Sequence, residues 1–251
     1  MESYALGAQV YGGALIFARI GSFCMTVPGV SEEMVPSQIR LAFAFVLTIA
    51  LFPLLAPHLP GIASTIPGMV YQIVGEIIMG LVIGLLLRTF TQALAVAGEV
   101  ISLQTTLSFA QTTNPLQAQP TASVTTFLTL IGLTVIFVSD LHMMFLAGIV
   151  KSYTLFPAGH GVPFADFNTL MVRTMGETFA LGIQLSAPVL VFSLVYNVAM
   201  GLIARVMPQF QIFFAISPLT VLLGMAVFGL SLGGIGLVWV DHYRAFASQW
   251  I

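Results

Sequence analysis

The chain alternates long apolar segments with short breaks that hold its prolines, its turn glycines and several of its few charges. A helix of about 20 apolar residues crosses a hydrocarbon core of about 30 Å, so this pattern predicts an all-α, membrane-associated protein. Six apolar segments can be counted, over about 4–27, 41–57, 66–87, 124–150, 178–203 and 212–240. No polar segment is long enough for a second, soluble domain, so we predict one domain over 1–251.

The lengths of these segments do not fit six regular spans. Only 12 residues, 41–52, precede Pro53, and they would make about 18 Å of helix. The uncharged segment 206–240 has 35 residues and would make about 52 Å, too long for one span. We expect a bend near Ser217–Pro218 or at Gly233–Gly234 to divide it into two shorter helices. Broken helices arranged in hairpins describe the pattern better than six regular spans.

Composition excludes several classes of protein. The chain has 7 Lys or Arg and 9 Asp or Glu, so 6% of its residues are charged, against about 25% in soluble domains. Lys151 is the single lysine and no GK[ST] phosphate loop occurs, while a net charge of −2 without a basic run predicts no nucleic-acid binding. Cys24 stands alone, so neither an internal disulfide nor a zinc cluster is expected. The start, Met1-Glu2-Ser3, lacks the basic residues of a cleavable signal peptide, and we expect it to be retained.

The charges give no clear membrane orientation. With six spans, three basic residues fall on each side, which the positive-inside rule cannot resolve. Counting 90–110 as a seventh span changes the ratio to five against one and would place the N-terminus outside. That segment carries polar side chains that are implausible against lipid: Gln92, Glu99, Gln104, Thr105 and Thr106. It belongs against protein or an aqueous lumen.

Glu76 lies inside the apolar segment 66–87. A carboxylate at the bilayer centre costs about 2.5–3.5 kcal/mol, so it should face a partner or water. Two interpretations remain open: a polar contact with a neighbouring subunit, or a proton or substrate pathway. Arg19 and Arg205 are further candidates for buried charges, and both are expected to pair with carboxylates or chain-end carbonyls. Glycines at a spacing of four, at 80 and 84 and at 229 and 233, would permit close helix packing.

Asp140 and His142 lie near the middle of the segment 124–150. Residues two apart on a helix point in nearly opposite directions, so these two cannot form one catalytic site. Ser139 has no nucleophile turn around it, and no HExxH motif occurs. We therefore expect no catalytic residues, and interpret the pair as a break between two half-length helices or as a polar contact.

The segment Gly98–Pro120 contains four glutamines and several hydroxyl groups, all of which need hydrogen-bond partners. Non-helical backbone is tolerated at membrane depth only where protein buries it or where it lines a cavity. The segment is therefore either a surface connection in water or a re-entrant loop at a pore. Composition alone does not decide between the two.

Several motifs taken together resemble one family, the flagellar biosynthesis protein FliR and its counterparts in type III secretion systems. The strongest match is Asn197-x3-Gly201-x3-Arg205-x2-Pro208-Gln209. Supporting matches are Arg19, Val35-Pro36-x2-Ile39-Arg40, Gly75-Glu76-x3-Gly80-x3-Gly84 and Gly98 to Gln104. The resemblance covers nearly the whole chain.

The chain departs from the family pattern in three places. Gln104-Thr105-Thr106 stands where Gln-x-Gly is expected, and Asn114-Pro115 stands where Asp-Pro is usual. Phe210-Gln211 replaces a pair such as Met-Asn. Losing a glycine and a carboxylate changes what can be inferred about the conformation of the loop 98–120.

The resemblance implies a single-copy, noncatalytic subunit of a flagellar export gate in the bacterial inner membrane, at the flagellar basal body. Its fold would be a FliP-like portion over about 1–175 followed by a FliQ-like helical hairpin over about 176–251. Its partners would be FliP-like and FliQ-like subunits, the larger export-gate proteins, membrane lipid and unfolded flagellar proteins in transit. No cofactor is implied.

The resemblance also assigns roles to residues. The channel plug would be the loop of Leu107, Ser108, Phe109, Ala110, Gln111, Thr112, Thr113 and Asn114. Buried or subunit-contacting polar residues would be Arg19, Arg40, Glu76, Glu99, Gln104, Asn197, Arg205 and Gln209. Close helix packing is expected at Gly80, Gly84, Gly201, Gly229 and Gly233. The alternative function is a self-contained secondary transporter in which Glu76, Asp140 and His142 relay protons.

Overall fold

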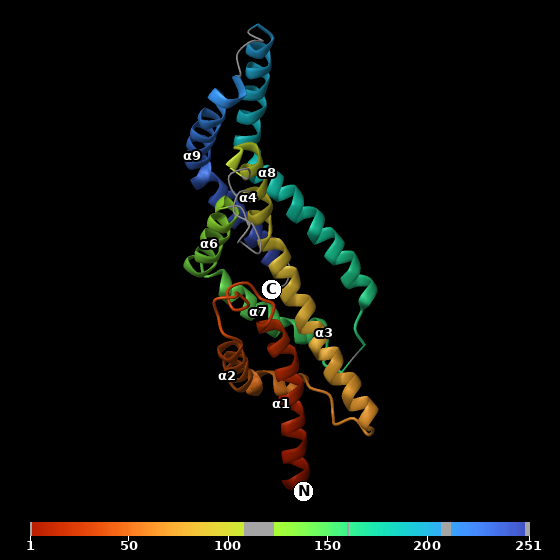
Figure 1. Ribbon diagram of the computed structural model, residues 1–251. Helices are drawn as coiled ribbons and strands as arrows, with labels where there is room; N and C mark the ends of the chain where they lie inside the picture. Colours follow the sequence, from red (N-terminus) through yellow and green to blue (C-terminus); the bar gives the residue numbers. More distant parts are fainter. Residues whose placement is uncertain (1, 108–122, 160, 207–211, 249–251) are drawn as a thin grey trace. The chain divides into compact units, whose positions relative to one another are not determined.

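A computed structural model describes residues 2–107, 123–159, 161–206 and 212–248, and these form helices, turns and irregular segments with no strand among them (Figure 1). The all-α prediction is confirmed for this part of the chain. A helix pairs its backbone N–H and C=O groups within one segment. This is needed here because the sequence has few polar side chains that could pair with them. The resemblance of its parts to FliP and FliQ stays a prediction.

The described residues form eight α-helices and one 3₁₀ helix. In chain order they are α1 (Glu2–Cys24), α2 (Ser37–Leu55), the 3₁₀ helix η1 (Ala56–His58), α3 (Ile66–Thr91), α4 (Ala93–Gln104), α6 (Ser123–Val138), α7 (Leu141–Leu155), α8 (Phe164–Val206) and α9 (Ile212–Ser248).

By length and composition, four helical segments of the described residues could cross a membrane. They are Ser37–His58, Ile66–Gln104, Phe164–Val206 and Pro218–Ser248, and the number becomes five if the bent pair α6 and α7 counts as one span. The spans are unequal, from 22 to 43 residues. Six regular spans are therefore not the arrangement of this chain.

The predicted short helix before Pro53 is wrong, because α2 has 19 residues and is long enough to span. Pro36, with φ −57° and ψ 141°, precedes the first turn. Its carbonyl accepts a hydrogen bond from the N–H of Ile39 at 3.0 Å, so the helix starts four residues before the apolar segment does. Pro53 falls in the last turn, where the helix is ending in any case.

The predicted division of segment 206–240 into two helices is also wrong. One helix, α9, contains both Pro218 and the pair Gly233–Gly234 among its 37 residues. A glycine costs about 1 kcal/mol in a helix interior, whereas an unpaired backbone group in an apolar setting costs several. Continuing the helix through these residues therefore costs less free energy than breaking it. In the same way α8 begins at Phe164, well before the apolar segment that predicted it.

The break at Asp140 is confirmed. The axes of α6 and α7 differ by 72° across it, and Asp140 has the left-handed φ of 58°, which aspartate adopts more readily than most residues. The ring of His142 packs on Phe137 across the bend, with ring centroids 5.4 Å apart. The apolar segment 124–150 therefore forms two half-length helices, as one of the two interpretations of Asp140 and His142 predicted.

The chain forms two compact units, each made of several chain segments. The first unit comprises Met1–Phe90, Ile136–Met175 and Arg244–Ile251, and the second comprises Thr91–Val135 and Gly176–Tyr243. The boundaries fall inside α6, α8 and α9 and before the last residue of α3, so both units contain parts of these helices.

In the first unit α1 is the central helix. Tyr11 contacts Gln72 of α3, and Arg19, further along α1, contacts Glu76, further along α3. Residue numbers thus increase in the same direction on both helices, so α1 and α3 run parallel. Phe17 meets Phe45 of α2 edge to face at 6.2 Å between ring centroids. The core here is aliphatic and aromatic: Leu15, Ile16, Ile20, Phe23 and Leu86 are buried.

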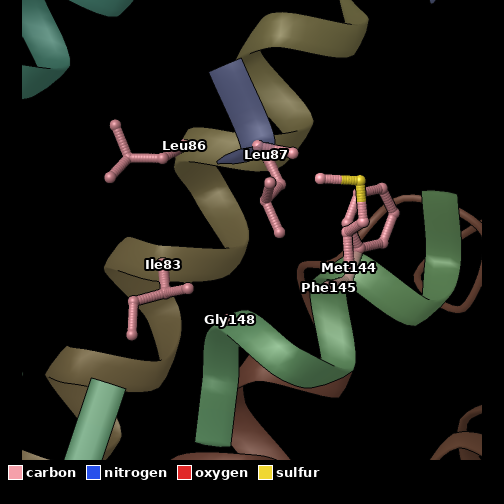
Figure 2. A pocket seen from close by; sticks show the side chains of 7 residues that line it. Ile83, Leu86, Leu87, Met144, Phe145 and Gly148 are labelled. Carbon is pink, nitrogen blue, oxygen red and sulfur yellow. The ribbon is translucent and has the colours of Figure 1, made fainter. Parts of the chain in front are cut away.

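Helix α7 packs on α3 in the same unit. Figure 2 shows Ile83, Leu86 and Leu87 of α3 beside Met144 and Phe145 of α7. The cavity between them has about 10 Å³ and an apolar lining, which is too small and too apolar for an ordered water. This contact is packed core and not a ligand site.

In the second unit α4 is the central helix. The backbone of Gly182 in α8 packs against Ala93 and Val96, and Ser193 bonds Gln104, so α8 runs parallel to α4. Gly98 packs on Thr125 of α6. Half of the 12 residues of α4 are buried by other helices of the unit. This explains how a helix with several polar side chains can form in so apolar a chain, because protein covers much of its surface.

Candidate functional site

The glycines of α3 bring α1 close enough for a charged contact to form. A Cβ built on Gly80 would lie closer than 3.0 Å to the carbonyl oxygen of Arg19 and to Ser22 Oγ, and one on Gly84 would clash with Thr26 Oγ1. Ser22 Oγ donates a hydrogen bond to the Arg19 carbonyl at 3.0 Å. Only glycine permits this approach, because any side chain would push the backbones apart.

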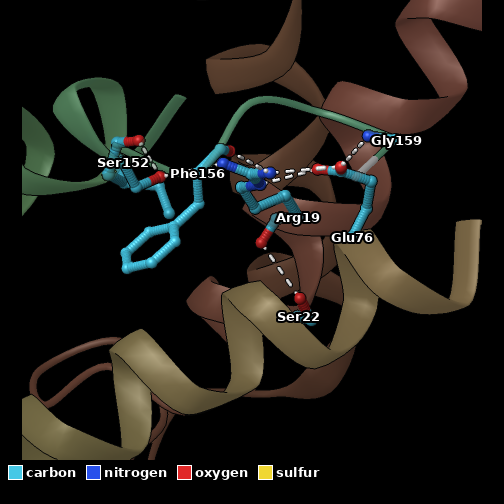
Figure 3. A network of polar contacts seen from close by, with 7 residues as sticks. Arg19, Ser22, Glu76, Ser152, Phe156 and Gly159 are labelled. Carbon is cyan, nitrogen blue, oxygen red and sulfur yellow. Dashed lines mark hydrogen bonds and ion pairs between the residues drawn. The ribbon is translucent and has the colours of Figure 1, made fainter. Parts of the chain in front are cut away.

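Arg19 and Glu76 form a buried, two-pronged ion pair between these helices. Arg19 Nε donates to Glu76 Oε2 at 2.6 Å, and Nη2 donates to Oε1 at 3.1 Å. The side chains are 1% and 3% exposed. Figure 3 shows the guanidinium and the carboxylate pointing toward each other. The planar fork of arginine matches the two carboxylate oxygens, which is the strongest geometry for such a pair.

The end of α7 and the turn after it supply further partners. Arg19 Nη1 donates to Ser152 Oγ at 3.2 Å and Nη2 donates to the Phe156 carbonyl at 3.1 Å. Gly159, whose φ is 79°, donates its N–H to Glu76 Oε1 at 3.2 Å. The Tyr153 ring lies 4.0 Å from Arg19 Cζ, in a cation–π contact. We call Arg19, Glu76, Ser152, Phe156 and Gly159 the α1–α3–α7 clamp.

The two charged side chains of the clamp, Arg19 and Glu76, pair with each other, so neither is available to act on a substrate. Glu76 accepts from the guanidinium and from Gly159, so it is poorly placed to take a proton from a substrate. Breaking a buried pair by removing one partner typically costs 3–5 kcal/mol, because the other charge stays buried. The arrangement joins three helices at one point, and its role is structural.

The proposed proton relay of Glu76, Asp140 and His142 finds no support in these contacts. Among the described residues no hydrogen bond links Glu76 to either of the other two. His142 Nδ1 is buried without a hydrogen-bond partner there. Nor do the described residues contain a group of three or more His, Cys, Asp or Glu side chains that could hold a metal ion.

One polar contact and one buried cysteine lie on α1, before and after Arg19 of the clamp. Toward the start of α1, the Tyr11 hydroxyl donates to Gln72 Oε1. Burial, with the negative charge of Glu76 as the second cause, raises the pKa of Tyr11 above its ordinary value, so the hydroxyl stays a donor. At the end of α1, Cys24 is buried, and burial raises the pKa of its thiol to about 11. The thiol is therefore protonated and packs as an apolar group.

A second polar site lies in the other unit, where α8 meets the end of α4. Ser193 Oγ donates to Gln104 Oε1 at 2.6 Å, and Asn197 Nδ2 donates to Ser193 Oγ at 3.2 Å. The hydroxyl acts as donor and acceptor at once, which is the full use of its hydrogen-bonding capacity toward these partners. We call Gln104, Ser193 and Asn197 the amide relay. It joins Asn197 of the C-terminal motif to α4, the helix that ends shortly before residue 108.

The residues after Gln104 are also fixed. Thr105 is 1% exposed and fits against Gly224 of α9, where a Cβ would lie 2.6 Å from its methyl carbon. Thr106 follows with the left-handed φ of 59°, at a position where the family pattern has glycine. Threonine is strained in that conformation, and the packing of Thr105 holds it there.

The remaining predicted residues have varied surroundings. Arg40 is half-buried and donates to the Val35 and Glu32 carbonyls, whereas Glu99 is exposed and accepts from Thr125 Oγ1 at 3.0 Å. Arg205 is exposed in the last turn of α8. No described atom lies within 4 Å of a Cβ built on the three other glycines, Gly201, Gly229 and Gly233. Close packing at these positions stays a prediction.

Part of the predicted site lies outside the described residues, namely Ser108, Phe109, Ala110, Gln111, Thr112, Thr113, Asn114 and Gln209. Leu107 is described and half-buried, directly after the strained Thr106. The plug assignment therefore stays a prediction that rests on the resemblance.

Sequence reasoning missed Ser152, Tyr153, Gly159 and Ser193. Serine and tyrosine in apolar helices give no signal of their own, since their partners are more than 80 positions away. Gly159 lies in a Pro-Ala-Gly turn and could have been noticed as a residue that adopts positive φ.

The fold and the site define a class: an all-helical, membrane-type protein whose buried polar groups hold its helices together. A family model described as bacterial export proteins, family 1, matches residues 10–246, and the chain belongs to this family. The flagellar biosynthetic protein FliR of Caulobacter vibrioides is 49% identical over 244 residues, which cover 97% of each chain. The FliR of Aquifex aeolicus is 30% identical over 92% of this chain and 89% of its own. The FliR of Escherichia coli is 28% identical over 83% and 79%. The resemblance expected from the motifs is confirmed.

We expect Arg19→Ala to lower the free energy of unfolding by about 3–5 kcal/mol, because Glu76 stays buried without its partner. Replacing both residues with apolar side chains, Arg19→Met and Glu76→Leu, should cost less than the single change. Unfolding in detergent, followed by circular dichroism against denaturant, measures both. Arg205→Ala is the matched control and should change stability by less than about 0.5 kcal/mol. If the effects of Arg19→Met and of Glu76→Leu, each measured alone, add up to the effect of the double change, the two residues are not coupled.

We expect Gly80→Ala to destabilise the chain by about 1–3 kcal/mol, since its methyl group would overlap the Arg19 carbonyl. Gly229→Ala is the control, because no described atom lies within 4 Å of its Cβ. It should be neutral or stabilise the helix by up to about 1 kcal/mol. The same unfolding measurement compares them, and equal stabilisation by both changes would refute the close contact of α1 with α3.

Proposed function

We propose that this chain is a noncatalytic core subunit of a flagellar type III protein-export gate in the bacterial inner membrane. The observation that carries the proposal is the match over nearly the whole chain to relatives named flagellar biosynthetic protein FliR. Unfolded flagellar subunits would pass through a channel that the chain forms with FliP-like and FliQ-like subunits. The larger export-gate proteins would deliver them.

The exposed apolar surface of α8 supports a place within an assembly. Only 11% of its most apolar window is buried in the chain. Large apolar side chains are exposed along it, including Val172, Phe179, Val191, Leu194, Val198 and Leu202. So many exposed apolar side chains along one helix need lipid or protein against them. A helix of 43 residues is about 64 Å long, so lipid alone cannot cover it and other subunits would cover the rest.

The loop Leu107–Asn114 would close the channel as a plug. Apolar side chains such as Phe109 exclude water and ions from a constriction without needing polar partners. The described residues support this by what precedes the loop: the amide relay and the Thr105 contact with Gly224 fix the end of α4. A plug that starts from a fixed point can close a channel reproducibly and still move beyond it.

Deleting Leu107–Thr113 should make the assembled gate leak small solutes, because the constriction loses its apolar side chains. Single-channel conductance or dye efflux from vesicles that carry the assembled complex measures the leak. Phe109→Ser should give a smaller leak, and Phe43→Ser, an exposed apolar position on α2, should give none. An unchanged conductance in deletion complexes of normal subunit composition would contradict the plug.

Co-expression with FliP-like and FliQ-like subunits should yield a stable hetero-oligomer that contains one copy of this chain. Native mass spectrometry of the purified complex gives the composition directly. The control is the chain expressed alone, in liposomes: a secondary transporter would move a solute without other subunits, and a gate subunit would not. If the chain alone transports a solute and forms no stable complex, the gate-subunit hypothesis is wrong and the secondary-transporter hypothesis is favoured.

A further inference from the structure

The residue two positions after α4 ends, Thr106, has a conformation that is unfavourable in two ways. Its φ of 59° is left-handed, and there the Cβ of an L-residue crowds the carbonyl that follows. Its hydroxyl oxygen is buried and has no hydrogen-bond partner among the described residues, which leaves the desolvation cost of that group uncompensated. Strain of this kind persists only where the surrounding structure imposes it.

A helical backbone at Thr106 would remove both problems. A threonine hydroxyl inside a helix can donate to the carbonyl four residues earlier, as Thr129 of α6 does to Thr125 at 2.8 Å. By the same geometry a helical Thr106 would donate to the carbonyl of Ser102. In the structure its backbone N–H donates to the Leu103 carbonyl at 3.3 Å, so the last turn is tighter than an α-helix and ends there.

Contacts with two other helices hold the end of α4 against this preference. Thr105 is buried, and its methyl carbon fits against Gly224 of α9, where a Cβ would lie 2.6 Å from it. Gln104 Oε1 accepts the 2.6 Å hydrogen bond from Ser193 of α8. Both residues before the strained position are thus fixed, one by packing and one by a hydrogen bond. Breaking either contact would leave the strain of Thr106 less firmly opposed.

We propose that Thr106 is a conformational switch with two states. In the held state, which is the conformation described above, α8 and α9 fix the two residues before Thr106 and its φ is left-handed. In the released state these contacts break, Thr106 becomes helical and its hydroxyl gains a partner. The strain of the held state lowers the free energy needed for release, so the residue at this position sets the ratio of the two states.

This inference rests on the proposed plug, because the loop assigned as the plug starts directly after Thr106. In the held state the loop starts from a fixed point and closes the channel. In the released state its starting direction changes and the channel opens. Thr106 is thus a positioning residue, which acts through the loop and not on an exported protein. A glycine here would favour the held state for two reasons: it adopts positive φ without strain, and it is a poor helix former.

Single-channel conductance of the assembled gate tests the switch with two changes of opposite effect. Ser193→Ala removes the hydrogen bond to Gln104 and should raise the open probability about fivefold. Adding Thr106→Gly should lower it again, by about tenfold, because glycine removes the strain of the held state. Ser231→Ala is the matched control, since this hydroxyl donates to the Phe228 carbonyl within α9, and it should leave the open probability unchanged.

A distance measurement on the full chain in detergent reports the switch without reference to the channel. Leu107→Cys and Val195→Cys, combined with Cys24→Ala, place nitroxide labels directly after the switch and at an exposed position on α8. Electron paramagnetic resonance then gives the distribution of distances between the labels. We expect one main distance in this background, a second population with Ser193→Ala, and the loss of that population when Thr106→Gly is added.

Two results would overturn the inference. A single distance in every variant would show that residue 106 has no second state. Changes of the same sign by Ser193→Ala and by Thr106→Gly, each measured alone, would show that both residues act through stability only. If the distances shift as expected while deletion of the plug leaves the conductance unchanged, the switch is supported and the plug is refuted, so the two proposals fail separately.

Discussion

The structure depends on one constraint: every charge that this apolar chain buries must be neutralised within reach of its own side chain. Arg19 and Glu76 meet it by forming two hydrogen bonds with each other. The pair then dictates what surrounds it. Gly80 and Gly84 must lack side chains so that α1 can approach, and the end of α7 must present a hydroxyl and a carbonyl to the remaining guanidinium protons. A single ionic contact thereby fixes three helices that hydrophobic packing alone would leave free to slide.

The second unit meets the same constraint with amides instead of charges. Gln104, Ser193 and Asn197 satisfy one another, and α4 buries its apolar face among α6, α8 and α9. Because α4 carries Glu99 on its exposed face, the helix has one side for its own chain and one for something else. Polar groups inside each unit are thus used for internal fixation, and the apolar surface outside is left for lipid and other subunits.

The sequence predicted the class of fold because hydrophobic periodicity and scarce charges constrain an apolar chain to helices. It also predicted that Arg19 and Glu76 each need a partner, and that α6 and α7 are separate helices at Asp140. It could not predict that the two charges bond each other, since residues 57 positions apart share no local pattern. It failed at Pro53 and Pro218 for the opposite reason: local helix-breaking preference was weighted above the cost of unpaired backbone groups in an apolar chain.

Helix length and exposure together explain why a self-contained transporter is the weaker interpretation. A transporter buries its polar pathway between its own helices and turns an apolar surface of roughly uniform height toward lipid. Here the segments that could span differ almost twofold in length, and the buried carboxylate is committed to an arginine. Unequal apolar helices on one chain leave surface above or below any single bilayer plane, and only other protein chains can cover that surface at a tolerable cost. These features favour a chain that works as one component of a larger export apparatus over a self-contained transporter.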